Sequence, residues 1–360
     1  MNILIYNPAA DSGGALTILT DFYNAVRNHP NRSINWHFII STPTLHPTTN
    51  IHIHRFPKIK NSWNERLYFD YISAPNLTKK YQIQKILSLQ NIPVPFQTIP
   101  QAVYLHQSLP FYEGKISIFD KWQRIYWIYK NIIGKKITSS LKKSDMVIVQ
   151  SDWMREKCIS ENLISPDKIK VIRPTIQIDS CTRFDSESSS FRTFFYPASG
   201  AFYKNHKVIL EASRLLIQRG IKNFRIIFTL SKDNHESLPI YDLTKKYGLP
   251  VSFIGQVDRE YVMSTYSRSV LIFPSLLETF GLPLAEAAGV GSPIIASDRV
   301  FCREVLDSYN NITFFDPHNP SELADIMLRT IKQEIEYSMI NLTNPSQDSM
   351  AQIIDEIISL

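Results

Sequence analysis

Short apolar segments alternate with longer amphipathic stretches along the whole chain. The apolar segments are rich in β-branched residues and fall into two series, 3–6, 34–41, 51–56, 102–106, 146–150 and 169–172, then 193–197, 224–230, 251–255, 270–274, 293–297 and 312–315. Strands that alternate with helices form parallel sheets with crossover helices. The pattern therefore predicts an α/β protein with two doubly wound, Rossmann-like domains that face a cleft.

A polar stretch without apolar periodicity, residues 179–190, separates the two series. It is rich in turn-forming residues, as linkers between domains usually are. We therefore predict an N-terminal domain over residues 1–178, a linker over 179–190 and a C-terminal domain over 191–346. A length of 360 residues suits two domains.

The composition indicates a folded protein, because 44% of the residues are hydrophobic and 20% are charged. The longest apolar runs are far shorter than the roughly 18 to 20 residues of a membrane-spanning helix. A core strand begins almost at the first residue, which leaves no room for a signal peptide. Cys158, Cys181 and Cys302 are few, scattered and odd in number, which favours a reducing compartment over disulfides or a zinc site. We expect a cytoplasmic protein.

Ligands of open parallel sheets bind in the loops that follow the strands, so we expect the functional residues in these loops. In the first loop, Gly13 and Gly14 would let a ligand approach the backbone, although a tight turn explains such a pair equally well. The loop lacks the GxGxxG pattern of dinucleotide binders. In the second loop, His106 follows an apolar strand and could form hydrogen bonds or transfer protons at neutral pH, or be structural.

The third and fourth loops suit an anion. Lys204 and Asn205 precede a helix, where a lysine and free backbone N–H groups together favour phosphate, although a solvated lysine is the common alternative. The segment ETFGLPLAEAAG places Glu278 in a loop and Glu286 in the helix that follows, which Gly289 is expected to end. A diphosphate at this helix start, with sugar hydroxyls on the two acids, would describe a nucleotide sugar. Alternatively, Glu286 binds no ligand and its negative charge only complements the positive N-terminal end of the helix dipole.

The sequence FPSLLETFGLPLAEAAGVGSPIIASD resembles the donor-site signature of the retaining glycosyltransferases of family four (glycosyl transferases group 1), which have the GT-B fold. GGAL, LHQSLPF, MVIVQSDWM, YPASGAFYKNH, FIGQV and FFDP follow the order of that family, which includes bacterial O-antigen and capsule sugar transferases. The resemblance implies that Glu286 holds the ribose, Glu278 the donor sugar and Lys204 the diphosphate. His106 would hydrogen-bond the sugar near its anomeric carbon, and Gly14 would offer a backbone N–H. The remaining expected donor-binding residues are Gly13, Ser199, Asn205, Gly255, Phe280, Gly281 and Leu282.

The chain departs from the family at one position. An arginine usually stands about five residues before the lysine, whereas this chain has Ser199 there, so other groups must hold the phosphates or the site differs. No Asp-x-Asp motif occurs. We therefore expect no metal and no cofactor, with retention of anomeric configuration implied by the resemblance. In this fold the C-terminal residues 347–360 would form a helix that packs back on the first domain.

Residues 121–143 contain seven basic residues and no acid. A helical wheel places apolar side chains on one stripe, Trp122, Tyr126, Tyr129, Ile133 and Ile137. Four basic residues lie roughly opposite, Lys121, Arg124, Lys135 and Lys142. Such a helix suits an anionic membrane surface, and its apolar side can pack in the core at the same time. The chain shows no nucleic-acid-binding module, and we treat His52 and His54 as structural.

These features predict transfer of a hexose from GDP-mannose or a UDP-hexose to a lipid-linked oligosaccharide in the synthesis of O-antigen, capsule or lipopolysaccharide. The enzyme would lie at the inner face of the cytoplasmic membrane. A nucleotide-sugar epimerase of the same fold is one alternative. A non-catalytic subunit that binds nucleotide sugars is another, suggested by the absent arginine. The sequence carries no signal of oligomeric state.

Overall fold

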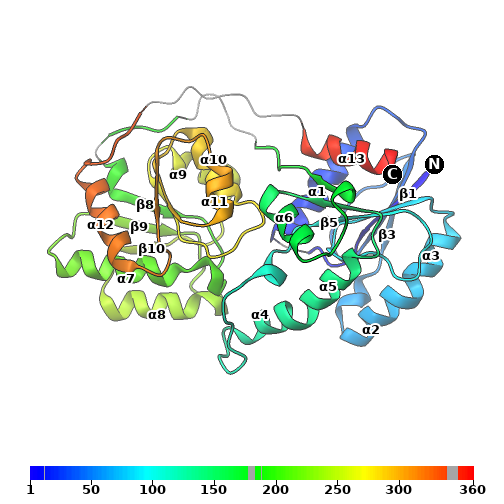
Figure 1. The fold of residues 1–360 in the computed structure, drawn as a ribbon, viewed down its shortest axis with the longest axis horizontal. Helices are drawn as coiled ribbons and strands as arrows, with labels where there is room; N and C mark the ends of the chain where they lie inside the picture. Colours follow the sequence, from blue (N-terminus) through cyan, green and yellow to red (C-terminus); the bar gives the residue numbers. More distant parts are fainter. Residues whose placement is uncertain (12, 177–182, 188, 339–347) are drawn as a thin grey trace. The chain divides into compact units, whose positions relative to one another are not determined.

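The computed structural model describes residues 1–360 except 12, 177–182, 188 and 339–347. Contacts divide the chain into two compact units (Figure 1). Unit 1 comprises Met1–Lys115, Tyr126–Pro174 and Gln347–Leu360, and unit 2 comprises Ile116–Ile125 and Thr175–Ser346. Residues 116–125, which were expected in the first domain, thus make their contacts with unit 2. Cys181 and much of the expected linker lie outside the described residues.

Unit 1 is built on a parallel sheet of seven strands in the order β3-β2-β1-β4-β5-β6-β7. The strands are β1 (Asn2–Asn7), β2 (Asn35–Ile40), β3 (Ile51–Arg55), β4 (Lys85–Ser88), β5 (Gln101–Leu105), β6 (Met146–Val149) and β7 (Ile169–Val171). Six of them lie where the apolar pattern predicted strands. The prediction missed β4, which has only two apolar residues, Ile86 and Leu87, between Lys85 and Ser88.

Successive residues of β1 point into two different cores. Ile3 and Ile5 belong to one buried cluster, whereas Leu4 and Tyr6 belong to another. Because side chains alternate across a strand, both faces of this sheet are covered, as a doubly wound fold requires. The first cluster also contains Phe22 of α1 (Gly13–Asn28) and Ile354 of α13 (Ser349–Ser359). The C-terminal helix therefore completes the core of unit 1.

The other helices of this part of the chain are short. They are η1 (Pro57–Lys60), α2 (Trp63–Tyr68), η2 (Phe69–Ser73), α3 (Ala74–Lys80), η3 (Leu109–Phe111), α4 (Arg124–Ile128), η4 (Tyr129–Ile133), α5 (Gly134–Leu141), α6 (Asp152–Ser160) and η5 (Pro166–Lys168). Both η2 and η4 are single π-helical segments inside longer helices.

Unit 2 has a parallel sheet of six strands in the order β10-β9-β8-β11-β12-β13. The strands are β8 (Thr193–Tyr196), β9 (Arg225–Phe228), β10 (Val251–Phe253), β11 (Val270–Phe273), β12 (Ile294–Ser297) and β13 (Ile312–Phe315). The helices are η6 (Ser190–Arg192), η7 (Phe202–Lys204), α7 (His206–Gln218), η8 (His235–Ser237), α8 (Leu238–Tyr247), α9 (Arg259–Tyr266), α10 (Leu282–Val290), α11 (Val300–Val305) and α12 (Pro320–Ile331). The predicted α/β class with two parallel sheets is confirmed. The predicted end of α10 at Gly289 is wrong, because Gly291, with a φ of +88°, ends that helix.

The basic segment 121–143 is not one regular helix. The π-helical η4 shifts the register between α4 and α5, so the predicted apolar stripe is broken and Tyr129 is exposed. Trp122 packs against His235 of unit 2, with ring centroids 4.1 Å apart, instead of on the first sheet. All four predicted membrane residues are exposed, but Lys121 and Arg124 belong to unit 2, whereas Lys135 and Lys142 belong to unit 1. Within the described residues, no helix is long and apolar enough to cross a membrane.

Three histidines meet on β2 and β3. His37 Nδ1 lies 3.1 Å from His54 Nε2, and the rings of His37 and His52 stack with centroids 4.7 Å apart. The ring of Tyr81 covers His54 at 4.3 Å. Burial, followed by the nearby His52 and His54, lowers the pKa of His37 to about 4. Burial also lowers the pKa of His54, so both rings are neutral at pH 7.

We expect acid to destabilise the protein through this cluster. The pKa of His37 is about 4 in the folded chain and 6.5 ordinarily. Between pH 4 and pH 6.5 the unfolded chain therefore binds more protons than the folded chain. The contribution to stability is therefore complete above pH 6.5 and is lost as the pH falls towards 4. For His37 alone the free energy of unfolding at pH 5 should be about 2 kcal/mol lower than at pH 8. In urea unfolding, His37→Gln should reduce the decrease in the free energy of unfolding between pH 8 and pH 5 by about this amount. His46→Gln changes an exposed histidine and is the matched control; equal acid losses in both variants would contradict the prediction.

Candidate functional site

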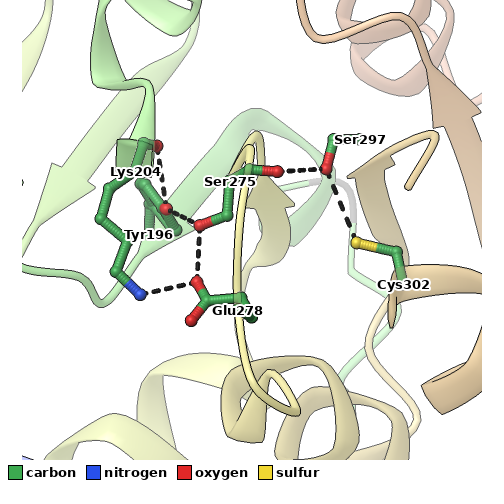
Figure 2. Close-up of polar contacts among 6 residues, drawn as sticks. All are labelled: Tyr196, Lys204, Ser275, Glu278, Ser297 and Cys302. Atoms are coloured by element: carbon green, nitrogen blue, oxygen red, sulfur yellow. Dashed lines mark hydrogen bonds and ion pairs between the residues drawn. The ribbon is translucent and has the colours of Figure 1, made fainter. Parts of the chain in front are cut away.

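Two loops of unit 2 bring a lysine and a carboxylate together. Lys204 ends η7 after β8, and Glu278 lies in the loop after β11, the strand that pairs with β8. The Lys204 Nζ atom lies 2.6 Å from Glu278 Oε1, and the side chains are only 18% and 14% exposed (Figure 2). A salt bridge this well shielded from water fixes the ammonium group at the carboxyl edge of the sheet.

A chain of hydrogen-bonded hydroxyl groups adjoins this pair. Ser275 Oγ donates a hydrogen bond to Glu278 Oε1 at 2.7 Å (Figure 2). The Tyr196 hydroxyl lies 2.7 Å from Ser275 Oγ and 3.0 Å from the Lys204 carbonyl oxygen. Ser297 Oγ in turn donates to the Ser275 carbonyl oxygen at 2.7 Å. Burial, followed by the charge of Glu278, raises the pKa of Tyr196 well above its ordinary value, so its hydroxyl stays protonated.

The N-terminus of α10 follows directly after Glu278. Gly281 caps the helix with a φ of +96°, which favours glycine, and an added Cβ would lie 3.1 Å from Leu284 Cδ1. The first backbone N–H groups of a helix lack intrahelical partners and carry partial positive charge. The first turn of α10 contains no acid. Glu286 therefore lies too far along the helix to be an ordinary first-turn complement to the dipole.

Glu286 is nearly buried, with 7% of its surface exposed. Its Oε1 atom lies 3.2 Å from an Arg259 guanidinium nitrogen, and the Tyr266 hydroxyl donates to Oε2 at 3.5 Å. Burial raises the pKa of Glu286, while Arg259 acts in the opposite direction. No interaction joins Glu286 to Lys204, so the described part of unit 2 contains two separate carboxylate positions on either side of the start of α10.

The remaining predicted residues of unit 2 shape the loops. Asn205 has a φ of +56° and starts α7, and its Nδ2 donates to the carbonyl oxygens of Pro317 at 2.8 Å and Pro274 at 3.3 Å. It thereby ties together the loops after β8, β11 and β13. Ser199 is exposed, Phe280 is buried and Leu282 is 40% exposed. Gly255 adopts a φ of +75° after β10.

His106, Gly13 and Gly14 belong to unit 1. His106 Nε2 lies 3.0 Å from the Leu89 carbonyl oxygen, and its backbone N–H donates to Asn91 Oδ1 at 2.7 Å. Burial lowers the pKa of His106, so the ring is neutral at pH 7 and donates from Nε2 to Leu89. Gly13, with a φ of +59°, and Gly14 begin α1 after β1. His106 and this glycine pair follow β5 and β1, which are separated in the sheet by β4 alone.

Sequence reasoning missed several partners of the predicted residues. Tyr196 ends β8 and Ser275 follows β11, so the rule that polar groups after strands are functional could have found both. Nothing in the sequence pairs Arg259 with Glu286 or Asn91 with His106, because these contacts depend on tertiary packing. Among the residues that the structure describes, no three His, Cys, Asp or Glu side chains are placed to hold a metal ion.

Sequence comparisons match this chain to glycosyltransferases. Residues 182–346 match the sequence model of the glycosyl transferases group 1. An uncharacterised glycosyltransferase of Methanocaldococcus jannaschii is 27% identical over 201 residues, which cover 51% of this chain and 50% of that protein. The chain spans about half the length of the curated relatives that it matches.

Two solved structures resemble the whole chain. Anabaena HepE in complex with UDP and glucose superposes with a TM-score of 0.69 at 15% identity, covering 100% of both chains. The lipopolysaccharide outer core galactosyltransferase WaaB has a TM-score of 0.66 at 16% identity, covering 100% of this chain and 99% of its own. The predicted GT-B fold and the resemblance to this family are confirmed.

Proposed function

We propose that the chain is a retaining glycosyltransferase that takes a hexose from a nucleotide-diphosphate sugar, because residues 182–346 match the sequence model of the glycosyl transferases group 1. The observation that carries this proposal is the shielded Lys204–Glu278 pair beside the N-terminus of α10. Lys204 and the helix N–H groups would bind the diphosphate, Glu278 the donor sugar and Glu286 the ribose. Gly13, Gly14, His106, Ser199, Asn205, Gly255, Phe280, Gly281 and Leu282 complete the proposed donor site.

The proposed chemistry follows from where charge develops. When the glycosidic bond to the donor phosphate breaks, the leaving nucleoside diphosphate gains negative charge, which a fixed ammonium and helix N–H groups stabilise without reorganisation. The family has an additional arginine where this chain has Ser199, and we propose that the lysine and the helix N–H groups suffice without that arginine and without a metal ion. His106, neutral and donating from Nε2 to Leu89, would act as a hydrogen-bonding group rather than as an acid.

We propose GDP-mannose or a UDP-hexose as donor and a lipid-linked oligosaccharide as acceptor, in the synthesis of O-antigen, capsule or lipopolysaccharide. The complex of HepE with UDP and the lipopolysaccharide role of WaaB support this choice. The exposed Lys121, Arg124, Lys135 and Lys142 would contact anionic lipids at the inner face of the cytoplasmic membrane. No nucleic acid is expected as a partner.

The donor site predicts a selective thermal stabilisation. With EDTA present, one member of a panel of UDP, GDP and dTDP sugars should stabilise the natural protein by about 2.7 kcal/mol at 100 times its dissociation constant. Glu286→Ala should lose most of this response, because the ribose would lose its carboxylate. Glu211→Ala, which changes a more exposed acid of α7, should keep it.

Two results would count against this assignment. A response that Glu286→Ala retains would place the nucleotide elsewhere, and a response that needs added metal would end the proposal of metal independence. Formation of an isomerised sugar from donor alone would favour the epimerase alternative.

A further inference from the structure

A groove lies in unit 1 between η1 and the helical segment α2–η2. Its volume is about 590 Å³, which is in the range of sites for small organic ligands. Most of the surface that lines it is apolar, with Phe56, Ile59, Tyr68, Phe69 and Ser73 among the lining residues. A mainly apolar surface suits a hydrocarbon better than a sugar or a nucleotide.

The helical segment α2–η2 beside this groove exposes much of its apolar surface. Its polar residues Arg66 and Asp70 face inwards, where Arg66 Nε donates to both Asp70 carboxylate oxygens at 3.0 Å and Asp70 accepts from the Tyr6 hydroxyl. Four of its large apolar residues are exposed, Trp63 by 70%, Leu67 by 44%, Tyr68 by 61% and Ile72 by 48%, whereas Phe69 is buried. None of the residues of α2 is buried. A segment anchored by a buried ion pair that presents tryptophan, tyrosine and aliphatic side chains is suited to the boundary between water and lipid.

The groove carries a small excess of positive charge. Residues 55–80 contain six basic residues and two acids; Arg66 is paired with Asp70, and Lys60 is paired with Asp11. Arg55 and Lys58 are exposed and line the groove, although Glu65 lines it as well. Arg55 uses one N–H on the Thr42 carbonyl oxygen and has further donors. Near the far end of η2, Lys136 lies 5.2 Å from the centroid of the Tyr71 ring.

We propose that this groove binds the hydrocarbon chain of a single anionic lipid, with the lipid phosphate held by Arg55 and Lys58. This inference rests on the proposed function in one respect, since we identify the lipid with the carrier of the acceptor glycan. The groove would hold the carrier by its chain at the membrane surface. The exposed side chains of α2–η2 would meanwhile lie among neighbouring lipids.

Dodecyl phosphate, used below the concentration at which it aggregates, tests this proposal by isothermal titration of the full chain. Dodecyltrimethylammonium, which has the same chain and the opposite charge, and inorganic phosphate should each bind at least about tenfold more weakly. Ser73→Phe fills the groove and should weaken dodecyl phosphate at least about tenfold. Lys58→Glu, at an exposed position that leaves the fold intact, should weaken it about five- to tenfold.

Phe96→Ser is the matched control, because Phe96 is 81% exposed in the same unit, contacts Tyr71 and does not line the groove. It should change the affinity less than about twofold. No binding to the natural protein, or an equal loss in Phe96→Ser and Ser73→Phe, would overturn the proposal; the second result would mean that dodecyl phosphate binds to the exposed apolar surface of unit 1 and not in the groove. A dimer that Ser73→Phe dissociates would overturn it too.

The same titrations separate this inference from the proposed function. Nucleotide-sugar stabilisation depends on unit 2, so its retention in a protein that does not bind dodecyl phosphate would refute the groove alone. Groove-dependent binding without any nucleotide-sugar response would instead refute the donor site.

Discussion

Lys204→Ala is expected to lower kcat for sugar transfer by about 10²- to 10³-fold, the usual effect of removing one preorganised donor to a developing negative charge. The ammonium group is held 2.6 Å from Glu278 and is largely shielded from water, so no mobile solvent cation replaces it easily. Its charge matters most when the diphosphate leaves, so kcat should fall more than KM rises. Initial rates with saturating donor, with and without EDTA, measure this effect.

Lys207→Ala provides the control for that experiment. Lys207 lies three residues further along the chain, is 70% exposed and pairs with Glu211 at 3.5 Å. Its loss should change kcat less than about twofold, since surface ion pairs contribute little. Lys204→Arg should recover part of the rate, because it keeps the charge while changing the geometry.

Thermal melting of Lys204→Ala must be compared with that of the natural protein, because the substitution leaves the Glu278 carboxylate with Ser275 alone. A variant that melts normally and transfers sugar at the natural rate would contradict the role of Lys204. If Lys204→Ala gave this result in an assembly reconstituted with partner proteins, it would favour the alternative that the chain is a non-catalytic subunit that binds nucleotide sugars.

The fold could be predicted because the physics of parallel sheets is visible in local composition. A strand buried on both faces must be apolar throughout, as Ile3 to Tyr6 and Val270 to Phe273 are, and such runs stand out between polar helices. The prediction missed strand β4 because this strand has only two apolar residues, flanked by Lys85 and Ser88. It nevertheless lies between β1 and β5 in the sheet, and these neighbouring strands supply its packing.

The basic segment shows a different limit. A helical wheel assumes 3.6 residues per turn, and the π-helical turn at Tyr129–Ile133 breaks that assumption. The four basic residues that one wheel placed on a single face are divided between two units. The same kind of segment, η2, interrupts the helix beside the groove of unit 1. Gly134 follows η4 directly and Pro75 stands two residues after η2, but a wheel drawn at 3.6 residues per turn ignores both, so the register became known only from the structure.

At the candidate site, spacing identified the acids and the lysine but not their partners. Glu278 and Glu286 could be found because FGLP between them marks the start of a helix. The contacts of Glu286 could not be predicted, since Arg259 comes from the first turn of another helix and Tyr266 from the end of that helix. Likewise, nothing in the sequence indicates that the amide nitrogen of Asn205 donates to two loop carbonyls.

The second large effect concerns α13, whose loss should destabilise unit 1 while leaving the donor site intact. Ile353, Ile354 and Ile357 are at most 1% exposed and belong to the same core cluster as Phe22 and Trp36. Ile354→Ala should therefore lower the free energy of unfolding by about 2 to 5 kcal/mol, the range for a buried isoleucine that leaves a cavity. Such a loss is a large part of the stability of an ordinary domain.

Urea unfolding followed by tryptophan fluorescence measures this loss selectively. Four of the five tryptophans lie in unit 1, and only Trp122 lies in unit 2. Asp355→Ala, at the exposed position next to Ile354, should change stability by less than about 0.5 kcal/mol. Under native conditions Ile354→Ala should bind the nucleotide sugar with unchanged affinity, because the proposed donor residues of unit 2 share no core with α13. An unfolding midpoint equal to that of Asp355→Ala would show that α13 contributes little to the core, and a loss of donor affinity would show that the unit 1 part of the proposed donor site, Gly13 and Gly14 of α1, depends on this core.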